Sequence, residues 1–180
     1  MQHVNIKIMA SQGDIDLVDA IPIFHRWIQE GSTPEMLIDV ADYKHVPDGP
    51  GIMVIGNEAD YSLDLQEDRL GLLYNRKSPV DFDSQGALKQ AFEAARTAAK
   101  GLEGESAFTG KLKFDAGDVE VIINDRIIAP NTDATLQALS PEIKKFFAGV
   151  YGTEDFVLEH RGEPRERFRV GVKTAKPVSV

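Results

Sequence analysis

The chain has 180 residues, a length typical of one domain, and its 42% hydrophobic and 27% charged residues match an average soluble globular protein. The net charge of −9 disfavours non-specific binding to nucleic-acid phosphates. The chain has no cysteine, which excludes disulfides and thiolate metal sites, and no stretch approaches the roughly 18 apolar residues of a membrane-spanning helix. We therefore expect a soluble protein without nucleic-acid or membrane partners.

The first part of the chain predicts one strand and one helix. Apolar and polar residues alternate over residues 4–8, as in a half-buried strand. Apolar residues then recur at helical spacing over residues 20–30, where Asp19 is a candidate cap and Gly31 a stop signal. The N-terminal segment lacks the roughly 7–15-residue apolar run of a signal peptide, so we expect a cytoplasmic protein.

Four short apolar-rich segments follow, and turn residues separate them. Their short connections allow antiparallel hairpins but not parallel crossovers, which need a dozen or more residues. We therefore predict an antiparallel meander. Its strands are Met36–Ala41, Ile52–Ile55, Tyr61–Leu65 and Leu70–Tyr74.

The segment Ser84–Leu102 gives the clearest helix pattern in the chain. Its apolar stripe is mostly alanine, which predicts close packing against a sheet or another helix. Asp83 or Ser84 is the expected cap, and Gly101 or Gly104 the expected stop.

A second meander and two short helices are predicted in the remainder. The helices run from residue 131 or 132 to Leu139 and onward from Pro141, with Ser140 as the cap of the second. The predicted strands are Leu112–Phe114, Val119–Ile123, Arg126–Ala129, Phe156–His160 and Phe168–Val172. The fold class is therefore a single α+β domain over residues 1–180, with antiparallel meanders packed against an alanine-rich helix and shorter helices. Residues 175–180 are expected to fray.

A catalytic interpretation centres on one polar loop. His45 beside Asp42 or Asp48 is typical of a general base whose imidazole is oriented by a carboxylate. This predicts a small hydrolase or isomerase. The competing interpretation makes His45 an ordinary loop residue and gives Asp42 and Asp48 roles in ending a strand and setting a turn.

A binding interpretation centres on aromatic residues. Trp27, Tyr43, Tyr61 and Tyr74 are candidates to line an apolar pocket between sheet and helices, with Arg76 able to pair with an anion at its mouth. The competing interpretation assigns the aromatic residues to the core and Arg76 to solvent. A large aromatic-lined cavity would make the protein a carrier of apolar ligands.

Metal and cofactor chemistry is not predicted. Glu58, Asp60 and Asp64 could approach a hard cation, but the sequence favours solvated turn and strand-edge carboxylates over a cation site. The four histidines are scattered and form no metal motif. We expect no metal and no cofactor.

The charge is distributed unevenly. Residues 1–68 carry 13 acidic and 3 basic side chains, whereas residues 161–180 carry 6 basic and 2 acidic ones. The basic segment can lie beside the acidic half, within one fold or in a dimer, or it can form a docking surface. The sequence favours a non-enzymatic domain that binds a small molecule or a protein partner and self-associates as a homodimer.

Overall fold

The structure is a computed structural model that describes residues 1 and 3–180. It has the predicted α+β architecture, with eight strands and three α-helices in the described residues. The helices are α1 (Ala20–Glu30), α2 (Ser84–Glu103) and α3 (Asp133–Tyr151). The strands are β1 (Val4–Gly13), β2 (Leu37–Tyr43), β3 (Gly51–Gly56), β4 (Ala59–Asp64), β5 (Gly71–Arg76), β6 (Leu112–Ile123), β7 (Phe156–Arg161) and β8 (Phe168–Thr174).

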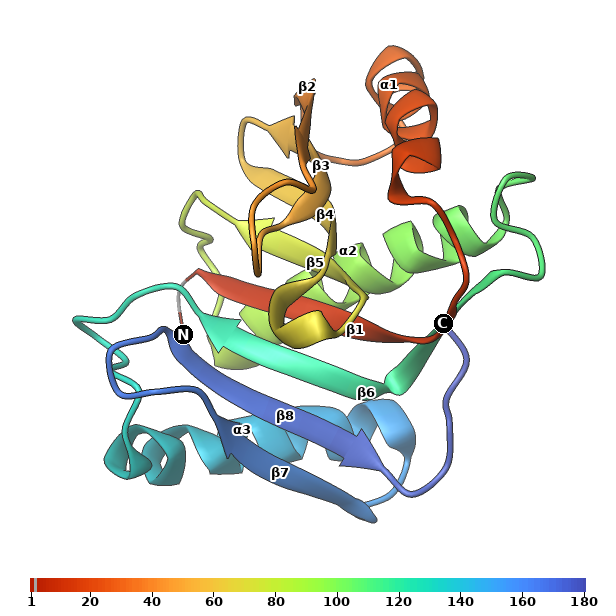
Figure 1. Cartoon of the computed structure of the whole chain (residues 1–180). Coiled ribbons are helices and arrows are strands. Elements are labelled where there is room, and N and C mark those ends of the chain that lie inside the picture. Colours follow the sequence, from red (N-terminus) through yellow and green to blue (C-terminus); the bar gives the residue numbers. More distant parts are fainter. Residues whose placement is uncertain (2) are drawn as a thin grey trace.

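All eight strands form one antiparallel sheet in the order β2-β3-β4-β5-β1-β6-β8-β7 (Figure 1). The meander predicted from the first half of the chain is confirmed as β2 to β5. The last two predicted strands, Phe156–His160 and Phe168–Val172, are confirmed as the antiparallel pair β7 and β8. No described helix has the length and apolar character needed to cross a membrane.

The helix predictions for the first half are also confirmed. Gly31 ends α1 with φ 62°, in the left-handed region that favours glycine. Asp83 caps α2 by accepting a hydrogen bond from the Gly86 amide. Asp19, however, makes no capping bond. Asp16 instead caps a short 3-10 turn that leads into α1.

The predicted turn between Leu112–Phe114 and Val119–Ile123 is wrong, because both segments belong to β6. The strand pairs with β1 on both sides of an irregularity, from Ile8 opposite Val119 to Ala10 opposite Phe114. Residues 115–118 of β6 therefore form a bulge opposite a single residue of β1, and the chain does not reverse its direction there.

Backbone groups of this bulge find partners elsewhere in the molecule. The Ala116 amide donates to the Val178 carbonyl, and Tyr151 Oη donates to the Ala116 carbonyl. The Val178 amide in turn donates to Asp115 Oδ1. Because these hydrogen bonds satisfy backbone groups of the bulge, the chain does not need a hairpin to pair them.

The predicted strand Arg126–Ala129 is wrong as well. The amides of Ile127 and Ile128 both donate to Asp125 Oδ1, and the Ala129 amide donates to the Asp125 carbonyl. Asp125 therefore closes a turn by accepting hydrogen bonds from the amides that follow it. Such local hydrogen bonds compete with the pairing of strands in a sheet.

The two short helices predicted after residue 130 form one helix, α3, with Pro141 in its interior. Thr132 caps it by accepting from the Thr135 amide. Proline removes one helical hydrogen bond. The helix continues past Pro141. Ile143 and Phe147, which follow the proline, are completely buried in the core.

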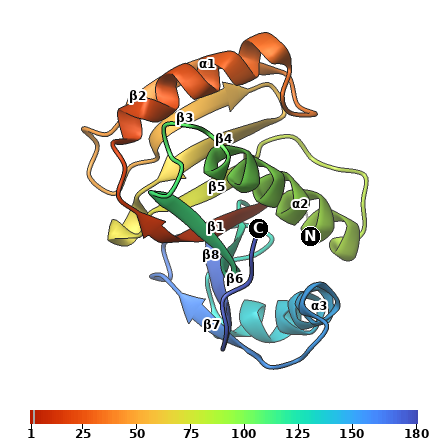
Figure 2. The ribbon, with the colours of Figure 1, turned by 90° about the vertical axis from the view of Figure 1, so that its right-hand side faces the viewer.

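The helices cover one face of the sheet (Figure 2). Helix α1 lies over β2 and β3, α2 over β5, β1 and β6, and α3 over β7. Strand β4 therefore lies beneath the gap between α1 and α2, because it is the strand between β3 and β5.

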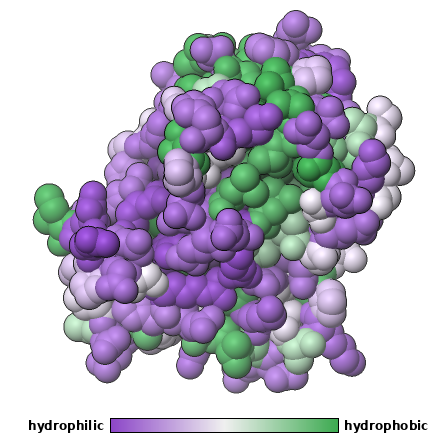
Figure 3. Space-filling model, in the orientation of Figure 1, coloured by the Kyte–Doolittle hydropathy of each residue, from purple (hydrophilic) through white to green (hydrophobic). Residues whose placement is uncertain are grey.

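The opposite face of the sheet is polar where β1, β4, β6 and β8 run (Figure 3). Lys7 is 2% exposed there and contacts Asp64 at 2.5 Å. Arg169, also 2% exposed, pairs with Glu67 and lies 3.8 Å from Glu120. The contact between Arg169 and Glu67 joins the basic C-terminal segment to the acidic N-terminal part of the chain.

Candidate functional site

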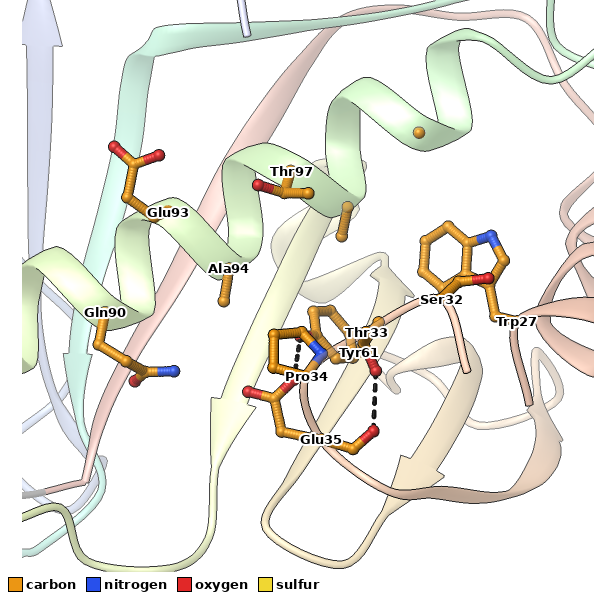
Figure 4. A pocket seen from close by; sticks show the side chains of 12 residues that line it. Trp27, Ser32, Thr33, Pro34, Glu35, Tyr61, Gln90, Glu93, Ala94 and Thr97 are labelled. Atoms are coloured by element: carbon orange, nitrogen blue, oxygen red, sulfur yellow. Dashed lines mark hydrogen bonds between the residues drawn. The ribbon is translucent and has the colours of Figure 1, made fainter. Parts of the chain in front are cut away.

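A pocket opens on the helix side of the sheet, in the gap between α1 and α2 (Figure 4). Its volume of about 470 Å³ is within the range of small-molecule sites. Tyr61 of β4 belongs to its lining, together with residues of α1, α2 and the loop after α1. The lining consists of Trp27, Ser32, Thr33, Pro34, Glu35, Tyr61, Gln90, Glu93, Ala94, Thr97, Ala98 and Gly101.

Most of the pocket wall is apolar. The Trp27 ring of α1 contributes one side, and small residues of α2 contribute the other. Figure 4 shows the Ala94 side chain pointing from α2 toward Pro34 and Tyr61. Small side chains on α2 are what leave this space open, since larger ones would extend across the gap.

One end of the pocket holds a buried carboxylate. Glu35 is 8% exposed, and its Oε2 accepts a hydrogen bond from Tyr61 Oη at 2.6 Å. Its Oε1 accepts one from Tyr74 Oη at 2.9 Å. Two phenol groups from neighbouring strands β4 and β5 therefore hold the carboxylate.

Both tyrosines stay neutral at physiological pH. Burial, followed by the hydrogen bond to Glu35, raises the pKa of Tyr61. Burial also raises the pKa of Tyr74, to about 12. Each phenol therefore keeps its proton and donates it to Glu35.

A glutamine and an arginine complete this end of the site. Gln90 Nε2 of α2 donates to Tyr74 Oη at 2.7 Å. Arg76 Nη1 lies 3.9 Å from Glu35 Oε1, while its Nε donates to the Ser78 carbonyl. Arg76 is not among the residues that line the pocket, so it contacts Glu35 from outside the cavity.

The loop that carries Glu35 is fixed by its own sequence. Gly31 turns the chain out of α1, and the Ser32 amide donates to the Trp27 carbonyl. Thr33 Oγ1 then donates to the Glu35 carbonyl at 3.0 Å, as drawn in Figure 4. These bonds direct the Glu35 side chain toward the sheet.

The structure brings together four of the five aromatic and basic residues that the sequence suggested for ligand binding. Trp27 and Tyr61 line the pocket, with ring centroids 6.3 Å apart and ring planes at 89°. Tyr74 and Arg76 contact Glu35 from beside it. Tyr43 lies apart, near the end of edge strand β2, and is 39% exposed.

The candidate catalytic residues lie in another place: Asp42 is near the end of β2, and His45 and Asp48 are in the loop between β2 and β3. His45, Asp42 and Asp48 are all exposed. Asp42 Oδ1 accepts from the Lys44 amide and Asp48 Oδ1 from the Glu67 amide. In the described part of the chain, no hydrogen bond or ion pair links His45 to either carboxylate, so the geometry gives a general base no support.

The carboxylates considered for a cation are engaged by protein donors. Asp60 contacts Lys77 Nζ at 2.7 Å, and Asp64 contacts Lys7 Nζ at 2.5 Å. Glu58 accepts from the Met36 amide. A hollow of about 270 Å³ on the polar face includes Asp60 and Asp64 in its lining. Asp60 and Asp64 are therefore already paired with the ammonium groups of Lys77 and Lys7.

Sequence reasoning missed Glu35 and Gln90. A usable signal for Gln90 exists, because it begins a row at helical spacing that continues through Ala94, Thr97 and Gly101. That row lies beside the alanine stripe of α2 and faces the pocket. Glu35 carries no comparable signal, since an acidic residue in a loop is ordinary.

The fold and site thus define an α+β domain with an apolar pocket that ends at a buried carboxylate. No family model matches the chain, and no curated protein matches it in sequence.

Proposed function

We propose that this protein is a non-enzymatic domain that binds a small molecule in the pocket between α1 and α2. The single observation that carries this proposal is the combination of an apolar wall with one buried, hydrogen-bonded carboxylate, Glu35, in a cavity of about 470 Å³. Binding sites for small molecules typically combine such walls with a few fixed polar groups.

Binding explains the pocket better than catalysis does. Among the described residues that line it, the ionisable groups are Glu35, Glu93 and the neutral Tyr61. Glu93 is half-exposed and contacts Arg96 at 2.9 Å on the surface. No histidine, lysine or arginine stands in the lining to work with Glu35 as an acid and base pair.

The test uses Nile red, a neutral apolar dye, as the probe. Trp27 is the single tryptophan of the chain and lines the pocket, so its emission reports on occupancy directly. We expect dye fluorescence to rise on binding and Trp27 emission to change at the same dye concentrations.

Two helical glycines give a matched pair of variants. A Cβ at Gly101 would lie 3.6 Å from Trp27 Cζ2, whereas a Cβ at Gly149 in α3 would meet nothing within 4 Å. Gly101→Leu fills the pocket beside Trp27 and is expected to weaken dye binding at least about tenfold. Gly149→Leu is expected to leave binding unchanged. Equal binding by both variants and the wild type would overturn the proposal.

We also propose that the protein self-associates through the turn between β6 and α3. Ile127 is 95% exposed and Ile128 76% exposed, although Asp125 holds their backbone in a fixed turn. The loop projects from the molecule in Figure 1, and a hydrophobic knob occupies the same place in Figure 3. Two adjacent exposed isoleucines form an apolar patch, and exposed apolar patches are typical of protein–protein contacts.

A second copy of this chain is the partner that the surface fits. An apolar hollow of about 450 Å³ lies beside the turn, lined in part by Ile128, Ala134, Ala138 and Leu139. A knob beside a hollow makes the surface self-complementary, which suits a two-fold contact because each copy presents both. Ile127 of each copy would enter the hollow of the other.

Sedimentation velocity tests the self-association. We expect a dimer at tens of micromolar and a monomer for Ile127→Asp at the same concentration. Val157→Asp is the control, since Val157 is 63% exposed on edge strand β7, away from the turn. A wild-type protein that stays monomeric would contradict this proposal and leave the ligand proposal intact.

A further inference from the structure

The pocket between α1 and α2 presents hydrogen-bond acceptors at its polar end. Both lining residues that carry a charge, Glu35 and Glu93, are acidic. The nearest cation to Glu35 is Arg76, at 3.9 Å and outside the lining. A bound molecule therefore meets carboxylate oxygen before it meets positive charge.

The carboxylate of Glu35 retains acceptor capacity. It receives one phenol proton on each oxygen, from Tyr61 and Tyr74. An ionised carboxylate has about four acceptor positions. The Glu35 side chain is 5% exposed, so water reaches the remaining positions poorly, and buried acceptor positions without a donor are costly.

The orientation of Gln90 adds a second acceptor. Tyr74 has one hydroxyl proton and gives it to Glu35, so the Tyr74 oxygen must accept from Gln90. The amide nitrogen of Gln90 therefore faces Tyr74, and its Oε1 remains an acceptor without a donor among the described residues. Gln90 belongs to the pocket lining.

The aromatic rings at the other side also favour positive charge. The Trp27 and Tyr61 rings meet nearly at right angles, with centroids 6.3 Å apart. The face of each ring carries negative electrostatic potential, and tryptophan attracts cations most strongly. The Trp27 and Tyr61 rings therefore suit a ligand whose apolar part lies next to a positive charge.

We propose that the natural ligand is a protonated amine on an apolar body, with its ammonium group at Glu35 and Gln90 and its apolar part against Trp27 and the small residues of α2. This inference rests on the proposed function and specifies the ligand class of the same pocket. An anionic ligand would bring its charge against Glu35, and a purely apolar one would leave the remaining acceptors unpaired.

The experiment compares three probes of equal length that differ in their head group: n-octylammonium, n-octanol and n-octanoate. Each is titrated at fixed ionic strength and neutral pH, followed by Trp27 emission and by displacement of Nile red. We expect n-octylammonium to bind at least about tenfold more tightly than n-octanoate, because a charge-assisted hydrogen bond adds to binding. The alcohol is expected between the two.

Substitution of the carboxylate gives an independent readout. Glu35→Gln is expected to weaken n-octylammonium binding about tenfold while changing n-octanol binding less than about twofold. Glu159→Gln is the control, because Glu159 lies on β7 outside the pocket lining, is 66% exposed and pairs with Arg161. Unchanged alcohol binding shows that the variant pocket is intact, and the probe order on the wild type decides the question where Glu35→Gln does not fold.

The possible results separate the two proposals. Equal or tighter binding of n-octanoate, or displacement of the dye by none of the three probes, overturns the amine inference while the small-molecule pocket stands. Failure of Nile red to bind, or binding insensitive to Gly101→Leu, overturns the pocket itself.

Discussion

The Tyr61 hydroxyl donates a 2.6 Å hydrogen bond to Glu35 Oε2, across 26 positions of sequence. Tyr61 stands on β4, and Glu35 lies in the loop that leaves α1. The hydrogen bond connects the loop to β4, the strand that lies beneath the gap between α1 and α2. It therefore sets both the floor and the polar end of the pocket.

Removal of this hydroxyl should destabilise the fold. Tyr61→Phe leaves Oε2 of the buried Glu35 without its donor, and hydrogen bonds to charged groups contribute about 1.5–3 kcal/mol. We expect a loss of that order in the free energy of unfolding, measured by urea titration. Tyr43→Phe is the matched control: Tyr43 is 39% exposed, and its loss should cost less than about 0.5 kcal/mol. Equal effects would mean that the contact with Glu35 contributes nothing.

The tyrosines also predict how stability depends on alkaline pH. Burial raises the pKa of Tyr74 from 10.0 to about 12, so between these values the unfolded chain loses a proton that the folded protein keeps. The contribution of Tyr74 is therefore fully present below pH 10 and is lost as pH rises toward 12.

Urea titrations at a series of pH values between 9 and 12 measure this effect, compared between wild type and Tyr74→Phe. The slope of unfolding free energy against pH should be less negative in the variant, by at most about 1.4 kcal/mol per pH unit. Identical slopes would show that Tyr74 titrates alike in the folded and unfolded states.

Much of the fold could be predicted from local sequence signals. The meander from β2 to β5 follows from short polar connections, and α1 and α2 follow from periodicity and caps such as Asp83. The failures share one cause, which is that distant partners decide them. The β6 bulge depends on Val178 and Tyr151, and the continuity of α3 through Pro141 accompanies the burial of its later residues in the core.

The site could be predicted only in part, because contacts between distant parts of the chain also decide it. The chain has one tryptophan and four tyrosines, so Trp27, Tyr61 and Tyr74 are natural candidates to line a pocket. Glu35 becomes special only when β4 and β5 place two phenols against it. Local sequence does not encode that convergence.

A buried ion pair on the polar face gives a further prediction. Lys7 and Asp64 contact each other at 2.5 Å, with side chains 2% and 6% exposed. Asp64→Asn leaves the Lys7 ammonium buried without a counter-charge, and breaking such pairs typically costs about 3–5 kcal/mol.

The exposed pair between Glu93 and Arg96 is the control, with side chains 46% and 45% exposed. Glu93→Gln should cost less than about 0.5 kcal/mol. Chemical denaturation of both variants measures the difference. Similar losses would indicate that water reaches Lys7 in the protein.

The last prediction concerns the close approach of two strands at Gly51, where β3 begins. Its φ of 62° lies in the left-handed region, and a Cβ there would come within 2.2 Å of the Leu63 carbonyl oxygen on β4. Gly51→Ala must therefore strain its own backbone and push the strands apart, with an expected loss of at least about 2 kcal/mol. Gly149→Ala has open space around it inside α3 and should instead stabilise the protein by up to about 1 kcal/mol. The unfolding midpoints of the two variants should shift in opposite directions from the wild type. A midpoint for Gly51→Ala that matches the wild type would contradict the contact between β3 and β4, and with it the placement of β4 beneath the pocket.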